Sequence, residues 1–242
     1  MTTFRYHPEI IERCPSTVGG VILAHGLRNG PTPAPLHAQY MEEQQAVLQR
    51  IGTTSLSQLP SLAAWRSVFR GFGLEPTQYR SAAEALLRRL TRKGDIPCIN
   101  TLVDIGNMVS IRYALPVAIF DTRHLQGAVT VRFADGTECY TTLNEQGIAH
   151  PEPGEVIFAD ETGLVIARRW CWRQSEPSAA QADTTDALIT VEAHHANSER
   201  DIADALDNLL TLLQHYSGGQ FRSGILNAQR RAISDEEQTQ TS

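Results

Sequence analysis

The chain has 242 residues, of which 41% are hydrophobic and 20% are charged, and its formal net charge is −6 at pH 7. This composition is typical of a soluble globular protein with a substantial core, and no apolar run approaches the 18 residues of a membrane span. The negative charge excludes a chain that attracts nucleic acid over its whole surface, so any RNA contact must be local.

The sequence contains no recognisable motif for binding a metal ion or a nucleotide cofactor. The adjacent residues His194 and His195 would point to opposite faces of a strand, and no Walker or dinucleotide glycine pattern is present, so we expect no metal and no cofactor. The first fourteen residues lack the apolar centre of a signal peptide, and we expect a cytoplasmic protein without membrane contact. The four cysteines are far apart and form no CxxC pair, so we expect reduced thiols rather than disulfides or a zinc site: Cys14, Cys98, Cys139 and Cys171.

The N-terminal half is predicted to contain one strand and three helices. Residues 18–25, VGGVILAH, indicate a buried strand, and helical spacing of apolar residues predicts helices at 36–51 and 62–72. Ser81 and Glu84 form a capping box for the next helix, which Gly94 ends. The last turns of that helix either complement the helix dipole as a solvated end or contact RNA phosphates through Arg88, Arg89, Arg92 and Lys93.

The central stretch, residues 99–121, joins a helix to a strand through a turn that contains a proline. Thr101 and Asp104 read as a second capping box, so the helix should begin at Thr101 or one residue earlier. One face of this helix is apolar, and a second stripe is polar. That stripe either holds a neighbouring loop by hydrogen bonds or lines a pocket, and it contains Asn100, Asp104, Asn107 and Ser110.

Strands dominate the region that follows. Residues 115–121 predict one strand, and residues 128–133 and 138–143 predict a hairpin around the turn signal Asp135-Gly136. A second hairpin pairs 154–159 with 164–172. If residues 168–174 are extended, Arg168, Trp170 and Trp172 share one face, which either stacks nucleotide bases or packs in the core, while Arg173 lies on the other face.

The C-terminal part is predicted to hold a loop at 174–186, a strand at 187–193 and a helix that ends before Gly218. Ser198 and Asp201 are the expected caps of this helix. Beyond Arg222 the sequence loses its periodicity, and we expect a disordered tail over 222–242. The predicted fold class is α+β, with mixed or antiparallel sheets and surrounding helices in a single domain over 1–221.

The run VDIGNMVSIRYALPVAIFD resembles a segment of the phenylalanyl-tRNA synthetase beta subunit, which contains Val-Asp-x-Thr-Asn and then Pro-x-His-Ala-Phe-Asp. That segment lies in the B3/B4 editing module of the synthetase, and the chain resembles still more closely the free-standing proteins made of that module alone. The resemblance covers roughly residues 79–193 and includes YRSAAEALLRR, GEVIFAD and RRWCWRQ. It implies a B3/B4-like fold.

The resemblance also implies a pocket that accepts a wrongly charged amino acid at the tRNA 3′ end. Asn107, Pro116 and Glu192 match the pocket-forming segments. Two positions depart from the family, because its threonine is Gly106 here and its histidine is Ala118. These departures put tyrosine specificity in doubt and leave no general base to carry over. The implied site has Asn107 and Glu192 as catalytic residues, and its substrate-binding residues are Asp104, Ser110, Pro116, Ala118 and Glu192.

Two functions follow as hypotheses. The first is a trans-acting aminoacyl-tRNA deacylase, and the alternative is a non-catalytic module that binds tRNA or an amino acid. No nucleophile is recognisable, since Ser110 lacks a GxSxG setting. The expected partner is the aminoacylated end of tRNA, bound weakly and with salt sensitivity through Arg88, Arg89, Arg92, Arg168 and Arg173. Nothing in the pattern indicates an oligomeric state.

The role of Glu192 is the sharpest hypothesis. A cationic aminoacyl ester needs a carboxylate to place its ammonium group, and strand alternation puts Glu192 on the face opposite Val191 and Ala193. The alternative is a surface glutamate paired with an arginine.

Overall fold

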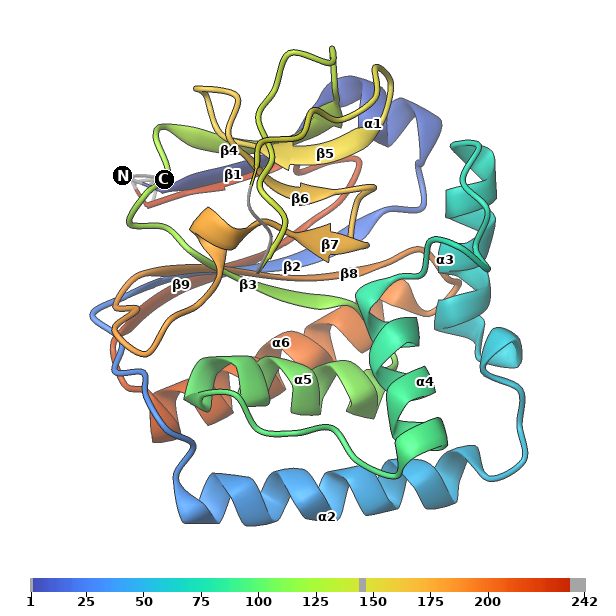
Figure 1. Ribbon diagram of the computed structural model, residues 1–242, viewed down its shortest axis with the longest axis vertical. Helices are drawn as coiled ribbons and strands as arrows, with labels where there is room; N and C mark the ends of the chain where they lie inside the picture. The colour runs from blue at the N-terminus through green and yellow to red at the C-terminus, as the bar shows by residue number, and fades with distance from the viewer. Residues whose placement is uncertain (1, 144–146, 236–242) are drawn as a thin grey trace, which may run out of the picture.

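The computed structural model describes residues 2–143 and 147–235 and consists of layers of sheet and helix (Figure 1). A four-stranded antiparallel sheet occupies the middle, with the strand order β3 (Val117–Asp121), β8 (Ala187–Ala193), β2 (Val18–His25) and β9 (Gln220–Leu226). Helices cover one face of it: α5 (Thr101–Tyr113) and α6 (Ser198–Tyr216) lie against the sheet, and α2 (Ala34–Ile51) lies below α5.

A second sheet packs on the opposite face of the first. Its strands follow the order β10 (Ala232–Ser234), β1 (Thr3–Tyr6), β4 (Ala128–Phe133), β5 (Val156–Ala159), β6 (Val165–Arg168) and β7 (Arg173–Gln174). The β1–β4 pair is parallel, and the other pairs in this sheet are antiparallel. The remaining helices are α1 (Pro8–Arg13), α3 (Pro60–Gly71) and α4 (Ala82–Lys93), with short 3₁₀ turns η1 (Leu56–Gln58) and η2 (Glu176–Ser178). The predicted α+β class with mixed and antiparallel sheets is confirmed.

Alternation along β8 separates two hydrophobic cores. Ile189 and Val191 belong to the core between the four-stranded sheet and the helices, whereas Leu188 belongs to the core between the two sheets. Because successive side chains of a strand point to opposite faces, Thr190 and Glu192 share the face of Leu188. A carboxylate is thereby placed in the space between the sheets.

The three helices with a predicted cap begin where the sequence predicted, but only α4 uses the predicted capping side chain, whereas α2 and α3 each begin two residues before the predicted start. Ser81 caps α4 by accepting a hydrogen bond from the Glu84 amide, although the Glu84 carboxylate accepts from Arg66 instead of completing the predicted box, and Gly94 ends the helix in the left-handed conformation. Helix α5 begins at Thr101, but its cap is Asn100, whose side chain accepts from the Val103 amide at 3.0 Å. The predicted Thr101–Asp104 box is wrong, because the Asp104 carboxylate binds residues outside the helix.

The cap of α6 is also corrected. Asn197 occupies the cap position without a side-chain hydrogen bond, and Ser198 is the first residue of the helix. Asp201 accepts a hydrogen bond from the His195 ring at 2.7 Å instead of completing a capping box. The Ser198–Asp201 box is therefore wrong, although the helix itself is present.

One of the two predicted hairpins is wrong. The hairpin of β5 and β6 is confirmed, whereas β4 pairs with β1 and β5, and residues 138–143 form only isolated bridges. The chain changes direction here because the Glu138 carboxylate accepts hydrogen bonds from the backbone amides of Asp135 and Gly136 and pairs with Arg132. The turn signal at Asp135-Gly136 is real, but the chain leaves it as a loop before it returns at β5.

The predicted disordered tail is wrong for residues 222–235. Strand β9 pairs with β2 from Gly19 to His25, and β10 pairs with β1 and buries Ile233 completely. The rest of the predicted tail, 236–242, lies outside the described residues. The single domain remains a prediction, with its C-terminal limit extended to at least Ser234. Across the part of the chain that is described, no helix combines the length and apolar character that a membrane crossing requires.

Candidate functional site

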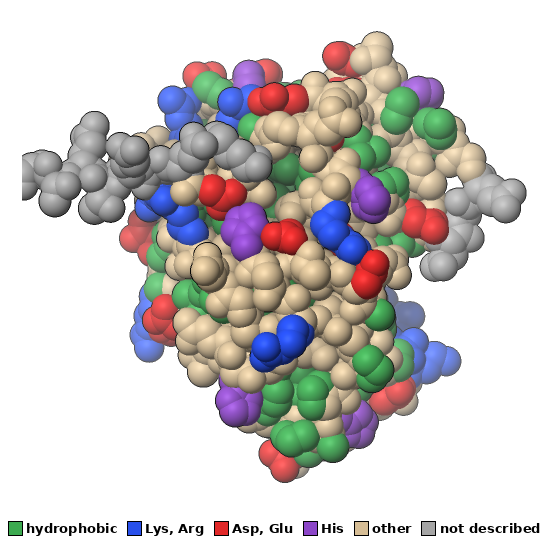
Figure 2. All heavy atoms as spheres, turned by 90° about the vertical axis from the view of Figure 1, so that its left-hand side faces the viewer, with side chains coloured by type: hydrophobic (Ala, Val, Ile, Leu, Met, Phe, Trp, Pro, Cys, Tyr) green, Lys and Arg blue, Asp and Glu red, His purple; other side chains and the backbone are tan. Residues whose placement is uncertain are grey.

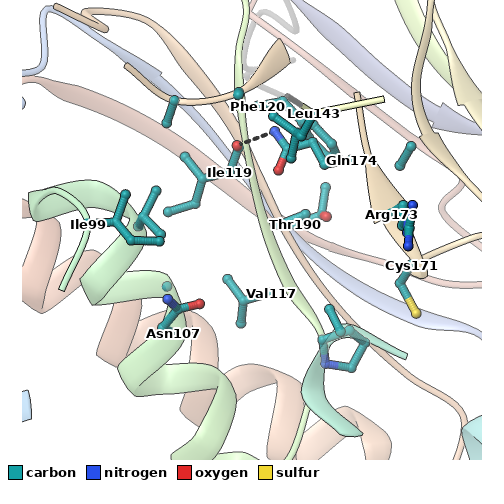
Figure 3. Close-up of a pocket in the computed structure, with 18 of the residues that line it drawn as sticks. Ile99, Asn107, Val117, Ile119, Phe120, Leu143, Cys171, Arg173, Gln174 and Thr190 are labelled. Atoms are coloured by element: carbon teal, nitrogen blue, oxygen red, sulfur yellow. Dashed lines mark hydrogen bonds between the residues drawn. The ribbon is translucent and has the colours of Figure 1, made fainter. Parts of the chain in front are cut away.

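A cavity of about 680 Å³ opens beside β3, one of the two edge strands of the four-stranded sheet (Figure 3). Helix α5 forms one wall and β3 another, while β5, β6 and the segment after β6 close it from the second sheet. Most of the lining is apolar or aromatic, including Val117, Ile119, Phe120, Phe158, Trp170 and Trp172. A pocket of this size and character suits a small organic group.

Helix α5 and strand β3 approach closely at Gly106. A Cβ atom at this position would lie 3.0 Å from Cδ1 of Ile119 and 3.5 Å from Cγ1 of Val117. Glycine therefore allows the helix to lie against the strand, which brings Asn107, the next residue, to the cavity wall. A threonine here, as in the resembling synthetase segment, would require Ile119 to move.

Glu192 is the acidic residue among those that line the cavity, and its side chain is buried. The Tyr6 hydroxyl donates to its Oε1 atom at 2.6 Å, and the Trp170 indole N–H donates to the same oxygen at 3.0 Å. Both hydrogen bonds therefore use Oε1. This arrangement leaves Oε2 as the oxygen through which Glu192 can meet a ligand.

Gly19 makes the contact between Tyr6 and Glu192 possible. It pairs with Glu192 across strands β2 and β8, and any Cβ atom on it would overlap the Tyr6 hydroxyl. Tyr6 crosses the backbone of β2 at this point to reach the carboxylate. Its hydroxyl stays protonated as a donor, because burial and the neighbouring Glu192 raise its pKa well above 10.

Burial controls the ionisation of Glu192. Removal from water raises the pKa of the carboxyl from 4.5 to about 7, against the lowering effect of the hydrogen bonds from Tyr6 and Trp170. The group therefore changes charge near neutral pH. A carboxyl that is costly to ionise in the empty cavity gains a favourable partner when a cation enters.

A strained turn after β6 delivers Trp170 to Glu192. Arg169 and Trp170 adopt positive φ angles of 46° and 61°, which non-glycine residues rarely take. Two hydrogen bonds hold the turn. The Glu155 carboxylate accepts one from the Arg169 backbone amide at 3.1 Å, and the Trp170 backbone amide donates the other to the Val156 carbonyl at 2.8 Å. Residues 168–174 are consequently not one extended strand, and the predicted sharing of one face by Arg168, Trp170 and Trp172 is wrong.

The structure brings together four of the residues predicted for the site. Asn107, Pro116, Ala118 and Glu192 all line the cavity. Ala118 pairs directly with Thr190 across β3 and β8, and Thr190 also lines the cavity. The position that carries a histidine in the resembling segment is therefore small here and adjoins a hydroxyl.

Two predicted residues serve the structure instead. Asp104 is fully buried, where it accepts the Ile99 amide at 2.9 Å and the Thr32 hydroxyl. Ser110 is also buried and donates to the Leu115 carbonyl at 2.7 Å, which fixes the turn before Pro116. Neither is among the residues that line the cavity. The polar stripe of α5 thus splits, with only Asn100 and Asn107 at the cavity.

The predicted RNA-binding arginines fall in different places, and on the face drawn in Figure 2 the Lys and Arg side chains are scattered among Asp and Glu side chains. Arg168 forms two hydrogen bonds of 2.8 Å with Glu155 and is only 12% exposed, so its charge is already compensated. Arg173 is exposed at the cavity, with its guanidinium 4.6 Å from the centre of the Trp172 ring. Arg88 and Arg92 line a separate hollow, and Arg89 binds Asp95.

Sequence reasoning missed Tyr6 and the donor role of Trp170. Tyr6 lies in a short strand near the N-terminus, and its contact with Glu192 spans 186 residues. The local signal is the Gly19-Gly20 pair within a buried strand, since a glycine inside a strand often marks the close approach of another group. Such a signal indicates a contact without identifying the partner.

The two neighbouring histidines do not share a site. His194 is buried between Trp65 and Trp170, at ring-centre distances of 4.3 and 5.1 Å. His195 binds Asp201 on α6. Among residues 2–143 and 147–235, no three His, Cys, Asp or Glu side chains gather where they could hold a metal ion.

The chain is similar to one protein family and to several curated proteins that share a name. The B3/4 domain family matches residues 64–218. A phenylalanine–tRNA ligase beta subunit from Synechococcus is 30% identical over 157 residues, which cover 59% of this chain and 19% of that protein. The corresponding subunit from Dechloromonas aromatica is 40% identical over 84 residues, which cover 35% of this chain and 10% of that protein. The chain thus spans about a fifth or less of the length of these curated relatives.

A solved structure also resembles the chain. It is an N-terminal fragment of the phenylalanyl-tRNA synthetase beta subunit from Pyrococcus horikoshii, with a TM-score of 0.46 and 12% sequence identity. The likeness covers 91% of this chain and 50% of that one.

Proposed function

The chain belongs to the B3/4 domain family, and on that basis we propose that it is a free-standing aminoacyl-tRNA editing protein that hydrolyses the ester of a mischarged tRNA in trans. The curated relatives are named as phenylalanine–tRNA ligase beta subunits, which links the family to tRNA. The observation that carries the proposal is the buried carboxylate of Glu192 in a largely apolar cavity.

An aminoacyl ester matches the cavity in charge and polarity. Its ammonium group is a cation that a desolvated carboxylate binds well, typically with about 1.5 to 3 kcal/mol for a charge-assisted hydrogen bond. Its side chain suits the apolar walls formed by Val117, Ile119 and Phe120. In this proposal Oε2 of Glu192 holds the ammonium, while Tyr6 and Trp170 fix the carboxylate through Oε1.

Hydrolysis needs a water molecule and a polarised carbonyl. The water oxygen bonds to the ester carbon, the bond to the ribose oxygen breaks, and a proton passes to that oxygen, which leaves free amino acid and tRNA. The neutral polar side chains of Asn107 and Thr190 line the cavity, and in this proposal they orient the carbonyl or the water. Because an aminoacyl ester is already activated, positioning and exclusion of bulk solvent suffice without a side-chain base.

A non-catalytic module that binds tRNA or an amino acid is the second candidate. One observation favours it: both positions that are polar in the resembling synthetase segment are apolar here, Gly106 and Ala118. The carboxylate and the apolar walls would serve the recognition of an amino acid without any turnover.

The two functions differ in what happens to the ester. Purified protein is incubated with a panel of tRNAs, each charged with a non-cognate amino acid, and the remaining ester is measured against time. Loss of one or more esters above the spontaneous rate supports the deacylase. Retention of charged tRNA on a filter, with every ester intact, supports the binding module.

A further inference from the structure

A second hollow of about 260 Å³ lies between η1, α3 and α4. Arg66, Arg88 and Arg92 line it together with Glu84, and Ser55 and Ser57 contribute hydroxyl groups. Helix α4 borders both hollows, because its first residue, Ala82, lines the main cavity. We call this second space the arginine hollow.

Positive charge in the arginine hollow exceeds negative charge. Glu84 is buried, and its Oε1 atom accepts a hydrogen bond of 2.8 Å from Arg66. Arg80 and Arg88 both approach that same oxygen only to 3.9 Å, beyond hydrogen-bond distance. In the part of the chain that is described, the buried Nε of Arg80 has no hydrogen-bond partner. One carboxylate thus lies near the guanidinium groups of Arg66 and Arg88, which line the hollow, and of Arg80, which does not, while Arg92 adds a further positive charge to the lining.

The crowding has an electrostatic consequence for Arg88. Burial lowers its pKa, and repulsion from Arg80, Arg92 and Arg66 lowers it further, against the opposing attraction of Glu84. An anion placed among these side chains would relieve the repulsion. The Ser55 and Ser57 hydroxyls lie at the same wall and are hydrogen-bonded to each other at 2.9 Å, so the pair offers one further neutral donor.

We propose that the arginine hollow is a phosphate-binding site. Guanidinium groups recognise phosphate oxygens through paired N–H donors, and clustered arginines are typical of phosphate recognition. The phosphate belongs either to an RNA backbone or to a small phosphate compound. This assignment concerns binding alone and does not depend on ester hydrolysis in the main cavity.

Neighbouring charges on α4 provide a matched control. Arg89 and Lys93 are exposed and are not among the residues that line the arginine hollow. Arg89 donates to the Asp95 carbonyl at 3.2 Å and lies 3.7 Å from its carboxylate. The sequence prediction grouped Arg88, Arg89 and Arg92, whereas the structure separates Arg89 from the other two. A pair of variants can therefore remove equal charge from one helix, inside and outside the hollow.

The test compares R88A/R92A with R89A/K93A. Binding of fluorescently labelled uncharged tRNA is followed by anisotropy over a range of salt concentrations, and binding of inorganic phosphate and pyrophosphate by calorimetry. We expect R88A/R92A to weaken tRNA binding about tenfold. The slope of the logarithm of the binding constant against the logarithm of the salt concentration should fall in magnitude by about one to two, and R89A/K93A should stay close to wild type in both measures. Loss of phosphate binding alone, with tRNA binding unchanged, assigns the site to a small phosphate compound.

A third variant increases the charge of the hollow without truncating a side chain. Glu84→Gln keeps the side-chain shape and the backbone amide that Ser81 caps, and it removes the negative charge. We expect it to bind tRNA or pyrophosphate several-fold more tightly than wild type. The proposal is overturned if R88A/R92A and R89A/K93A bind every probe alike, or if Glu84→Gln fails to strengthen any of them.

Discussion

The Tyr6 hydroxyl donates a 2.6 Å hydrogen bond to Oε1 of Glu192, although Tyr6 lies outside the segment that matches the B3/4 domain family. Strand β1 therefore supplies a residue to the candidate site from a part of the chain without a family match. Tyr6 is a positioning residue in this account, because it holds the carboxylate and does not meet the substrate.

Replacing Tyr6 by phenylalanine should raise the pKa of Glu192 above its present value of about 7. The hydrogen bond from Tyr6 favours the ionised carboxyl, so its loss favours the protonated form. The measurement is the pH titration of the Glu192 carboxyl by carbon NMR, with the signal assigned by its absence in Glu192→Gln. Tyr140→Phe, which removes a buried hydroxyl from the Gln174 carbonyl, is the control and should leave the titration unchanged.

Glu192 should also make the fold less stable as the pH rises. Its folded pKa of about 7 exceeds its ordinary value of 4.5, so the folded state holds the proton over this interval while the unfolded state loses it. Between pH 5 and pH 8, wild type should lose on the order of 2 kcal/mol of unfolding free energy relative to Glu192→Gln. Urea denaturation of both proteins measures this difference. Parallel pH dependence would mean that the carboxyl has an ordinary pKa.

Gly106→Thr tests the close approach of α5 and β3. The added side chain meets Cδ1 of Ile119, and we expect a loss of about 1 to 3 kcal/mol in unfolding free energy from overpacking. Adding Ile119→Val removes that terminal carbon and should recover part of the loss. If the double variant is no more stable than Gly106→Thr alone, the contact with Ile119 does not limit this position.

His25, at the end of β2, should hold the C-terminal strand β10 in place in a pH-dependent way. Its ring lies 2.8 Å from Asp186 and 3.1 Å from Asp235, and although burial lowers its pKa, these carboxylates raise it overall. The stabilisation that the protonated His25 ring provides is complete below its ordinary pKa of 6.5, and it is lost as the pH rises through the pKa of His25 in the folded protein. The ring is partly exposed, so the effect should be modest and local. Hydrogen-exchange protection factors at 232–234, which correct for the base-catalysed intrinsic rate, should fall above neutral pH in wild type and show no such step in His25→Ala.

The sequence predicted local features well where a short segment determines the outcome. The cap and end of α4 depend on Ser81 and Gly94, and the β5–β6 hairpin depends on the turn between its strands. Alternation also placed Glu192 on the face opposite Val191. Each of these needs only the periodicity or turn chemistry of neighbouring residues.

Features that depend on distant partners were not predictable in the same way. The turn at Arg169 and Trp170 breaks an apparent strand because Glu155, on another segment, accepts the Arg169 amide. Strand β9 spans the point at which periodicity fades, and it forms because β2 offers it an edge. The two hydrogen bonds on Glu192 join β1, β8 and the segment after β6, a combination that no local pattern encodes.

The most direct test of the central claim combines Glu192→Gln with removal of the substrate's charge. Deacylation of the best mischarged tRNA is compared with that of the same tRNA carrying an N-acetylated amino acid, which has no ammonium group. If Glu192 holds the ammonium, Glu192→Gln should slow hydrolysis of the free-amine ester by roughly tenfold to a hundredfold and leave hydrolysis of the acetylated ester unchanged. Equal rates for wild type and Glu192→Gln on the free-amine ester, in a variant shown to be folded, would contradict the account.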